Sequence, residues 1–137
     1  MSELLKVFEG GIAQINAGRI DELLEGFHRD GRMVMPGGEE LSWENLGDLY
    51  RMMTVAYPDM RWEILRSIEA GQTLIVELRF HGTQTGPLYL PTGPLPPTGR
   101  RVTYRTCEVI DYRDGKVALW HAYFDQVAII TQLGLMT

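Results

Sequence analysis

The spacing of the apolar residues changes near Met60, and this change limits the possible folds more than any other feature of the chain. Before Met60, apolar residues recur every three or four positions, which is the period of a helix with one buried face. After Met60 they recur at every second position, which is the period of a strand. The sequence therefore predicts an α+β fold, in which helices pack on one face of a curved sheet of long, mostly antiparallel strands.

The expected elements follow from this change of period and from the turn residues. Helices are predicted over residues 4–15, 21–24 and 43–57, and a short hairpin with strand 33–35 lies between the last two. Ser42 is placed to cap the third helix, and Pro58 ends it. Strands are predicted over residues 60–64, 74–81, 101–110 and 117–125, with a long loop over 86–99 and a tight turn at residues 114–115. Residues 126–135 fit a short final helix.

Size and charge exclude several classes of function. The 137 residues fit a single domain over 1–137, which can bury a core and still hold a ligand cavity. The net charge of -5 argues against a nucleic-acid partner, because phosphate binding needs a basic face. The N-terminus lacks a signal peptide, no apolar run is long enough to span a membrane, and Cys107 cannot form an internal disulfide. We therefore expect a cytoplasmic protein with no membrane contact.

Polar residues on the last predicted strand supply the first candidates for a site. Steps of two from Val117 place His121, Tyr123 and Asp125 on one face. We assign this face to the interior, because it gathers three groups that can transfer protons. A desolvated Asp125 would have a raised pKa and is the predicted acid/base group, assisted by His121. Two alternatives remain open: Asp125 could cap the final helix, and His121 could be a core or surface histidine if the register differs by one.

The neighbouring strands and the third helix supply further candidates. Glu108 lies on the inward register of its strand, near Leu119 or His121, unless it pairs with Arg105 or a facing strand. Gln84 continues the inward register of the strand before it. Candidate substrate-binding residues are thus Gln84, Tyr123 and Glu108, with apolar walls from Leu78, Phe80, Tyr104, Trp62, Tyr50 and Met53.

Other kinds of site find little support in the sequence. The three histidines, at positions 28, 81 and 121, show no short-range metal-binding spacing, so no metal is expected. There is no phosphate-binding loop and no nucleophile elbow. Acid/base chemistry in an apolar pocket without a cofactor remains the best-supported enzymatic class.

Both faces of strand 117–125 are partly apolar, which indicates that both are covered. Helices would cover one face. The other needs a partner, most simply a second copy of the chain, so a homodimer is expected.

Several short motifs, in order, give the chain a family resemblance. They are Tyr57-Pro58-Asp59-Met60-Arg61-Trp62, Gly82-Thr83-Gln84-Thr85-Gly86-Pro87, Pro96-Pro97-Thr98-Gly99-Arg100-Arg101-Val102, Asp114-Gly115-Lys116-Val117 with Trp120 and Asp125, and Gln132-Leu133-Gly134-Leu135. Together they resemble the SnoaL-like polyketide cyclases, which have the ketosteroid-isomerase-like fold. Two positions depart from the family pattern: Gln84 replaces a common histidine, and the order Trp120-His121 reverses the usual His-Trp.

The resemblance implies a conical α+β barrel with a deep pocket, usually a homodimer. It also implies ring closure of a polyketide by intramolecular aldol condensation, without metal or cofactor, with Asp125 in the acid/base position. We therefore expect a cyclase or isomerase that acts on a small apolar carbonyl compound. Two other hypotheses stay open: a dimeric module that only binds an apolar metabolite, and a hydratase or epoxide hydrolase in which Asp125, Glu108 and His121 surround a water.

Overall fold

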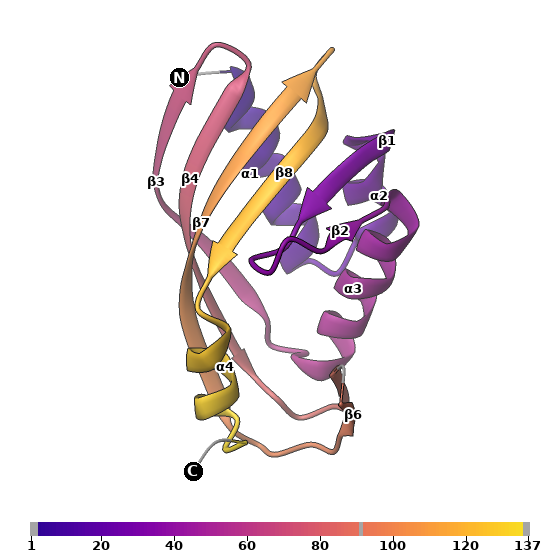
Figure 1. The fold of residues 1–137 in the computed structure, drawn as a ribbon, viewed down its shortest axis with the longest axis vertical. Helices are drawn as coiled ribbons and strands as arrows, with labels where there is room; N and C mark the ends of the chain where they lie inside the picture. The colour runs from indigo at the N-terminus through magenta and orange to yellow at the C-terminus, as the bar shows by residue number, and fades with distance from the viewer. Residues whose placement is uncertain (1–2, 91, 136–137) are drawn as a thin grey trace.

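The computed structural model describes residues 3–90 and 92–135, which form four helices and eight strands (Figure 1). The helices are α1 (Glu3–Asn16), α2 (Ile20–Glu25), α3 (Trp43–Ala56) and α4 (Gln126–Gln132). The strands are β1 (Phe27–Val34), β2 (Glu40–Leu41), β3 (Arg61–Ala70), β4 (Thr73–Thr83), β5 (Leu88–Leu90), β6 (Gly93–Leu95), β7 (Arg101–Arg113) and β8 (Lys116–Phe124).

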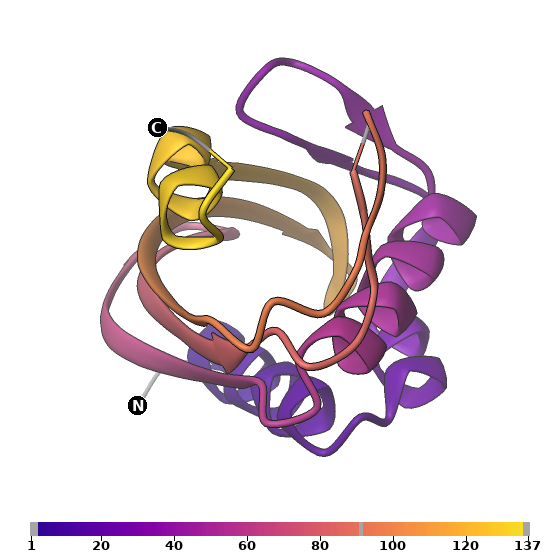
Figure 2. The same cartoon turned by 90° about the horizontal axis from the view of Figure 1, so that it is seen from below.

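Six of the strands form one curved sheet in the order β2-β1-β8-β7-β4-β3. All neighbours in it are antiparallel except β1 and β8, which run parallel. Seen from below, the sheet curves around the molecule and the helices α1 to α3 lie on its open side (Figure 2). The sheet does not close, since β2 and β3 are free edges, so the expected barrel is an open cone.

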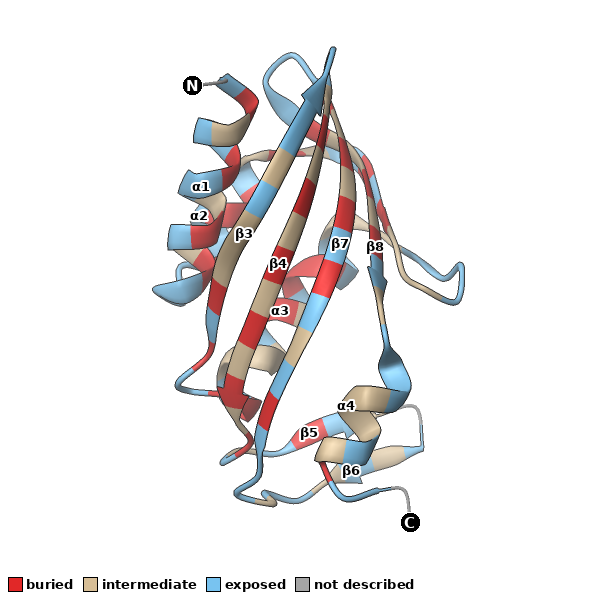
Figure 3. Ribbon diagram, turned by 90° about the vertical axis from the view of Figure 1, so that its left-hand side faces the viewer, coloured by how far each residue is buried: buried red, intermediate tan, exposed pale blue. Residues whose placement is uncertain are grey.

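The predicted periods are confirmed in the helices and in the central strands. Along β4, buried and half-buried residues alternate without interruption, and Figure 3 shows this banding on the ribbon. Ser42 caps α3, where its hydroxyl accepts a hydrogen bond from the Asn45 amide. Asp114 and Gly115 connect β7 to β8 with φ angles of 54° and 78°, as a two-residue hairpin turn requires.

Residues 86–99, predicted to form only a loop, contain a small ladder of β5 and β6. The two strands have three residues each, and this ladder stays separate from the main sheet.

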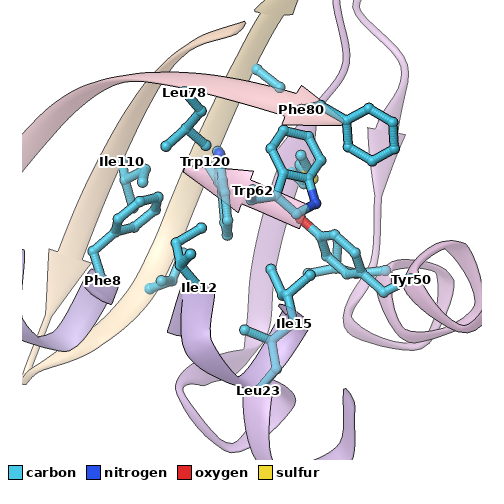
Figure 4. Packing of buried hydrophobic residues seen from close by; sticks show 14 of the residues in the cluster. Phe8, Ile12, Ile15, Leu23, Tyr50, Trp62, Leu78, Phe80, Ile110 and Trp120 are labelled. Carbon is cyan, nitrogen blue, oxygen red and sulfur yellow. The ribbon is translucent and has the colours of Figure 1, made fainter. Parts of the chain in front are cut away.

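The core fills most of the space between the sheet and the helices. Figure 4 shows Phe8, Ile12 and Ile15 of α1 meeting side chains of the sheet and of α3. Aromatic rings dominate one part of it: Phe80 lies 4.9 Å from both Trp62 and Tyr104, between ring centroids. Contacts of this kind stabilise beyond the area they bury.

A β-bulge in β8 reverses the faces predicted for that strand. Asp111 pairs with Leu119, but Tyr112 pairs with Val117, so Ala118 is an extra residue on β8. The bulge lets Val117 and Trp120 both face the interior, and Ala122 follows Trp120 on that side. The prediction that His121, Tyr123 and Asp125 lie inside is therefore wrong.

Candidate active site

Asp125 caps a helix at the protein surface. Its carboxylate accepts hydrogen bonds from the amides of Val127, at 3.0 Å, and Ala128, at 3.1 Å, at the start of α4. The side chain is exposed, so the desolvation on which its predicted role depends is absent. The alternative reading, a cap for the final helix, describes what the structure shows.

His121 and Tyr123 lie together on the outer face of the sheet. Their rings stack with centroids 6.2 Å apart, and Tyr123 is 52% exposed. Neither residue reaches the interior.

Gln84 is completely buried, as its register predicts, but its amide holds a loop. The carbonyl oxygen accepts hydrogen bonds from the amide and the hydroxyl of Thr98, at 2.9 and 2.6 Å. The amide nitrogen donates to the carbonyls of Gly86, at 2.8 Å, and Pro96, at 3.2 Å. These bonds use both ends of the side chain to fix the loop over residues 84–98.

Glu108 is the buried acid that the structure places in the interior. It lies in the middle of β7, pairs with Ala122 of β8, and is only 3% exposed. Its carboxylate accepts a hydrogen bond of 2.8 Å from the indole nitrogen of Trp120. The expected neighbours, Leu119 and His121, are displaced by the bulge.

Burial raises the pKa of the Glu108 carboxyl to about 7, although the polar side chains of Thr106 and Trp120 act in the opposite direction. At neutral pH the carboxyl is thus divided between its neutral and ionised forms. A group in this state can both accept and donate a proton, which general acid/base catalysis requires.

Three further polar groups lie around this carboxyl. The Tyr50 hydroxyl has a pKa well above its ordinary value, because of burial and the charges of Glu108 and Tyr104, so it stays a hydrogen-bond donor. Trp62 is 8% exposed, and its indole nitrogen has no hydrogen-bond partner among the described residues. Apart from its effect on the pKa of Glu108, the buried hydroxyl of Thr106 has no hydrogen-bond partner there. Buried donors without partners are rare, and each needs an explanation.

The free space beside Glu108 is small. A void of about 10 Å³ is lined by Ile12, Ile15, Tyr50, Trp62, Leu78, Glu108 and Trp120. This volume holds about one water molecule. A larger ligand can reach Glu108 only if side chains of this lining move.

The predicted apolar wall is brought together around this point. Tyr50, Trp62 and Leu78 line the void itself, and Figure 4 shows their side chains converging. Phe80 and Tyr104 continue the aromatic cluster beyond Trp62. Met53 is half-buried and packs against the same core.

The described residues contain neither a metal-binding cluster nor a membrane-spanning helix. No group of three or more His, Cys, Asp or Glu side chains there is arranged to hold a metal ion. No helix in the described ranges is long and apolar enough to cross a membrane.

Residues 8–120 match the family model described as the SnoaL-like domain. The chain belongs to this family. The match includes Glu108 and ends at Trp120, before Asp125. No curated protein matches the sequence.

Solved structures with the same fold include SnoaL-like proteins and other enzymes. The chain is similar to AclR, a proposed hydroxylase from Streptomyces galilaeus, with 19% identity and a TM-score of 0.86, over 100% of this chain and 88% of that one. A SnoaL-like polyketide cyclase from Agrobacterium tumefaciens gives 23% identity and a TM-score of 0.78, over 98% and 100%. An LEH-like epoxide hydrolase from M. tuberculosis gives 18% identity and a TM-score of 0.72, over 96% and 89%. At these identities the likeness shows the fold alone.

Proposed function

We propose that this SnoaL-like protein is a cofactor-independent acid/base enzyme for small apolar carbonyl compounds of the polyketide type, and that Glu108 transfers the proton. One observation carries the proposal: a carboxyl buried in an aromatic core, with a pKa near 7. Strongly perturbed acids in apolar surroundings are typical of active sites.

In the proposed reaction, the Glu108 carboxylate takes a proton from a carbon next to a carbonyl. The electron pair of that C–H bond becomes an enolate, whose oxygen accepts hydrogen bonds from the Tyr50 hydroxyl and the Trp62 indole. In a cyclase, the enolate carbon attacks a second carbonyl of the same molecule. Protonated Glu108 then returns its proton to the new alkoxide. An isomerase would return the proton to another carbon.

Deuterium exchange tests the first step without knowledge of the natural substrate. We would incubate the protein with 2-tetralone, an uncharged bicyclic ketone, in D2O and follow exchange at the carbon next to the carbonyl by NMR. Wild-type protein should exchange faster than buffer, with a rate that rises with pH and is half-maximal near pH 7. Glu108→Gln should lose this rate, whereas Glu69→Gln, at an exposed position of β3, should keep it.

Two outcomes of this experiment would count against the proposal. Exchange that survives Glu108→Gln would remove Glu108 from proton transfer. Saturable binding of 2-tetralone with no exchange would favour the module that only binds an apolar metabolite.

A second function, hydrolysis by an activated water, is favoured by the void of about 10 Å³ and the unpartnered Trp62 nitrogen. A water there could accept from Trp62 and donate to the Glu108 carboxylate, which would make it a better nucleophile. Styrene oxide tests this chemistry. Hydrolysis is followed in H2(18)O by incorporation of oxygen-18 into the product. Wild-type protein that accelerates this reaction, when Glu108→Gln does not and neither exchanges 2-tetralone, would favour the hydrolase.

The apolar outer face of the sheet supports a homodimer. Ile68 is 56% exposed and Tyr123 52%, and Ile75, Val109 and Leu119 are half-buried on the same face. Figure 3 shows this side of the sheet toward the viewer along β3, β4 and β7, with α3 behind the strands. A patch of this kind is typical of an interface between identical subunits.

Light scattering during size-exclusion chromatography tests the dimer. Tyr123→Arg places a charge on the sheet face and should yield a monomer, whereas Val55→Arg, on an exposed position of α3, should not. A wild-type protein that is already monomeric would refute this inference.

A further inference from the structure

A groove between α1 and α2 lies behind the buried carboxyl site. It has a volume of about 340 Å³ and opens to solvent beside the exposed side chains of Lys6, Glu22 and Glu25. Its apolar lining includes Phe8, Leu23, Phe27, Val117 and Trp120. The volume lies within the range of small-molecule sites.

The groove and the void beside Glu108 are separated by very few side chains. Ile12, Ile15 and Trp120 line both spaces. The ring of Trp120 stacks on Phe27 at 5.4 Å and meets the edge of Phe8 at 6.0 Å, both on the groove side. Its nitrogen donates to Glu108 on the other side. A small movement of this indole would therefore join the groove to the carboxyl.

Tyr112 supplies a free polar group in this apolar lining. Its side chain is 5% exposed, and its hydroxyl makes no hydrogen bond to the described residues. Burial raises the pKa of the hydroxyl, which keeps it neutral. The oxygen stays accessible to solvent from the groove, so a ligand oxygen there would replace a water molecule as its hydrogen-bond partner.

Two glycines in the middle of α1 keep the groove open. A Cβ at Gly10 would meet nothing within 4 Å, and one at Gly11 would make an ordinary contact of 3.5 Å with Leu23. Packing within the chain therefore does not require glycine at either position, although glycine weakens a helix interior. The missing side chains leave space in the groove wall.

We propose that this groove binds an uncharged aromatic molecule of about two fused rings that carries a hydroxyl or carbonyl, and that it leads past Trp120 to Glu108. Aromatic side chains favour a flat apolar ligand. Two carboxylates and one ammonium at the rim disfavour an anion. Tyr112 would bond the ligand oxygen. The second half of the proposal, the route to Glu108, rests on the proposed function.

Binding is tested with 2-naphthol, by NMR of the protein labelled with nitrogen-15. The indole N–H signal of Trp120, assigned with Trp120→Phe, should shift and saturate. The signal of Trp43, whose indole bonds Leu24 outside the groove, should not. A Trp120 signal that does not respond would overturn the proposal.

Three variants locate the ligand. Gly10→Leu fills the groove and should weaken 2-naphthol binding by about tenfold or more, whereas Ala13→Leu, on the exposed side of α1, should change it by less than about twofold. Tyr112→Phe should weaken 2-naphthol by about fivefold and leave naphthalene unchanged, because only the first can bond the hydroxyl. If Tyr112→Phe weakens 2-naphthol and naphthalene equally, the contact between the Tyr112 hydroxyl and the ligand oxygen is refuted. This comparison does not depend on whether Gly10→Leu folds.

The exchange of 2-tetralone separates the two halves of the proposal. If the groove leads to Glu108, Gly10→Leu should slow exchange as much as it weakens binding, and Ala13→Leu should not. If Glu108→Gln abolishes exchange but Gly10→Leu does not slow it, the proposed route is wrong and the proposed function is left intact. Suppose instead that the groove variants change 2-naphthol binding as expected but the protein does not catalyse exchange of 2-tetralone. This result would refute the proposed function and leave the groove site intact.

Discussion

Replacing Glu108 by glutamine removes one ionisable group from the core and keeps its shape. The amide oxygen of glutamine can still accept the hydrogen bond that Trp120 donates to Glu108. Glutamine therefore imitates the protonated acid and cannot ionise. The change isolates the free energy that the charge of Glu108 adds to or removes from the fold.

The size and sign of the effect follow from the two pKa values of the carboxyl. Burial raises the pKa from its ordinary value of 4.5 to about 7 in the folded chain. Between these values the folded chain keeps a proton that the unfolded chain has lost, so stability falls as pH rises. At about 1.4 kcal/mol per pH unit, the loss is about 3 kcal/mol. The stabilisation by protonated Glu108 is complete below pH 4.5 and is lost above about pH 7.

Urea unfolding, followed by tryptophan fluorescence, measures this difference from about pH 5 to about pH 8. Wild-type protein should lose about 2–3 kcal/mol more over this range than Glu108→Gln. Asp30, Asp59 and Glu63 have lowered pKa values, so they titrate at more acidic pH and do not mask the effect. Glu69→Gln, an exposed control, should follow the wild type.

A wild-type curve parallel to that of Glu108→Gln would refute the reasoning. Such a result would mean that the carboxyl is solvated in the folded chain and ionises at an ordinary pH. The proposed proton transfer would then lose its physical basis as well.

Three other substitutions have defined outcomes. Trp120→Phe removes the N–H that Glu108 accepts from, so unfolding free energy in urea should fall by about 1–3 kcal/mol, and the pKa of Glu108 should rise further. Gly10→Ala should raise unfolding free energy by about 0.5–1 kcal/mol and increase Tm in calorimetry, since the added methyl meets open space; a lower Tm would contradict this. Asp125→Ala should cost about 1 kcal/mol by removal of the α4 cap, and Asp125→Asn much less. Loss of 2-tetralone exchange in Asp125→Asn would return the base to that position.

The features that the sequence predicts correctly depend on local chemistry. Alternation along β4 needs only a strand with one buried face, and the turn at Asp114 and Gly115 needs only two residues that accept positive φ. The inward register of Glu108 follows in the same way from its neighbours on β7. Each of these patterns is complete within a few residues of chain.

The bulge at Ala118 could not be predicted, because distant residues determine it. Gly31 of β1 lies so close to β8 that a Cβ there would stand 3.1 Å from the Val117 carbonyl and 3.3 Å from that of Ala118. The irregular parallel pairing of β1 with β8 and the extra residue opposite β7 thus occur at the same place. Counting in steps of two assumes an unbroken ladder, and one extra residue moves every later side chain to the other face.

The two acids show how position along a strand limits what a carboxylate can do. Asp125 follows the last residue of β8 and precedes a helix, where free backbone amides satisfy a carboxylate at the surface. Glu108 lies in mid-strand, where the ladder already uses the backbone amides, so only side chains such as Trp120 can bond its carboxyl. Burial without backbone donors leaves the ionised form poorly stabilised, and this raises the pKa into the range where proton transfer is useful. An inward acid in mid-strand is therefore a stronger candidate for proton transfer than an acid at a strand end, because local capping cannot account for it.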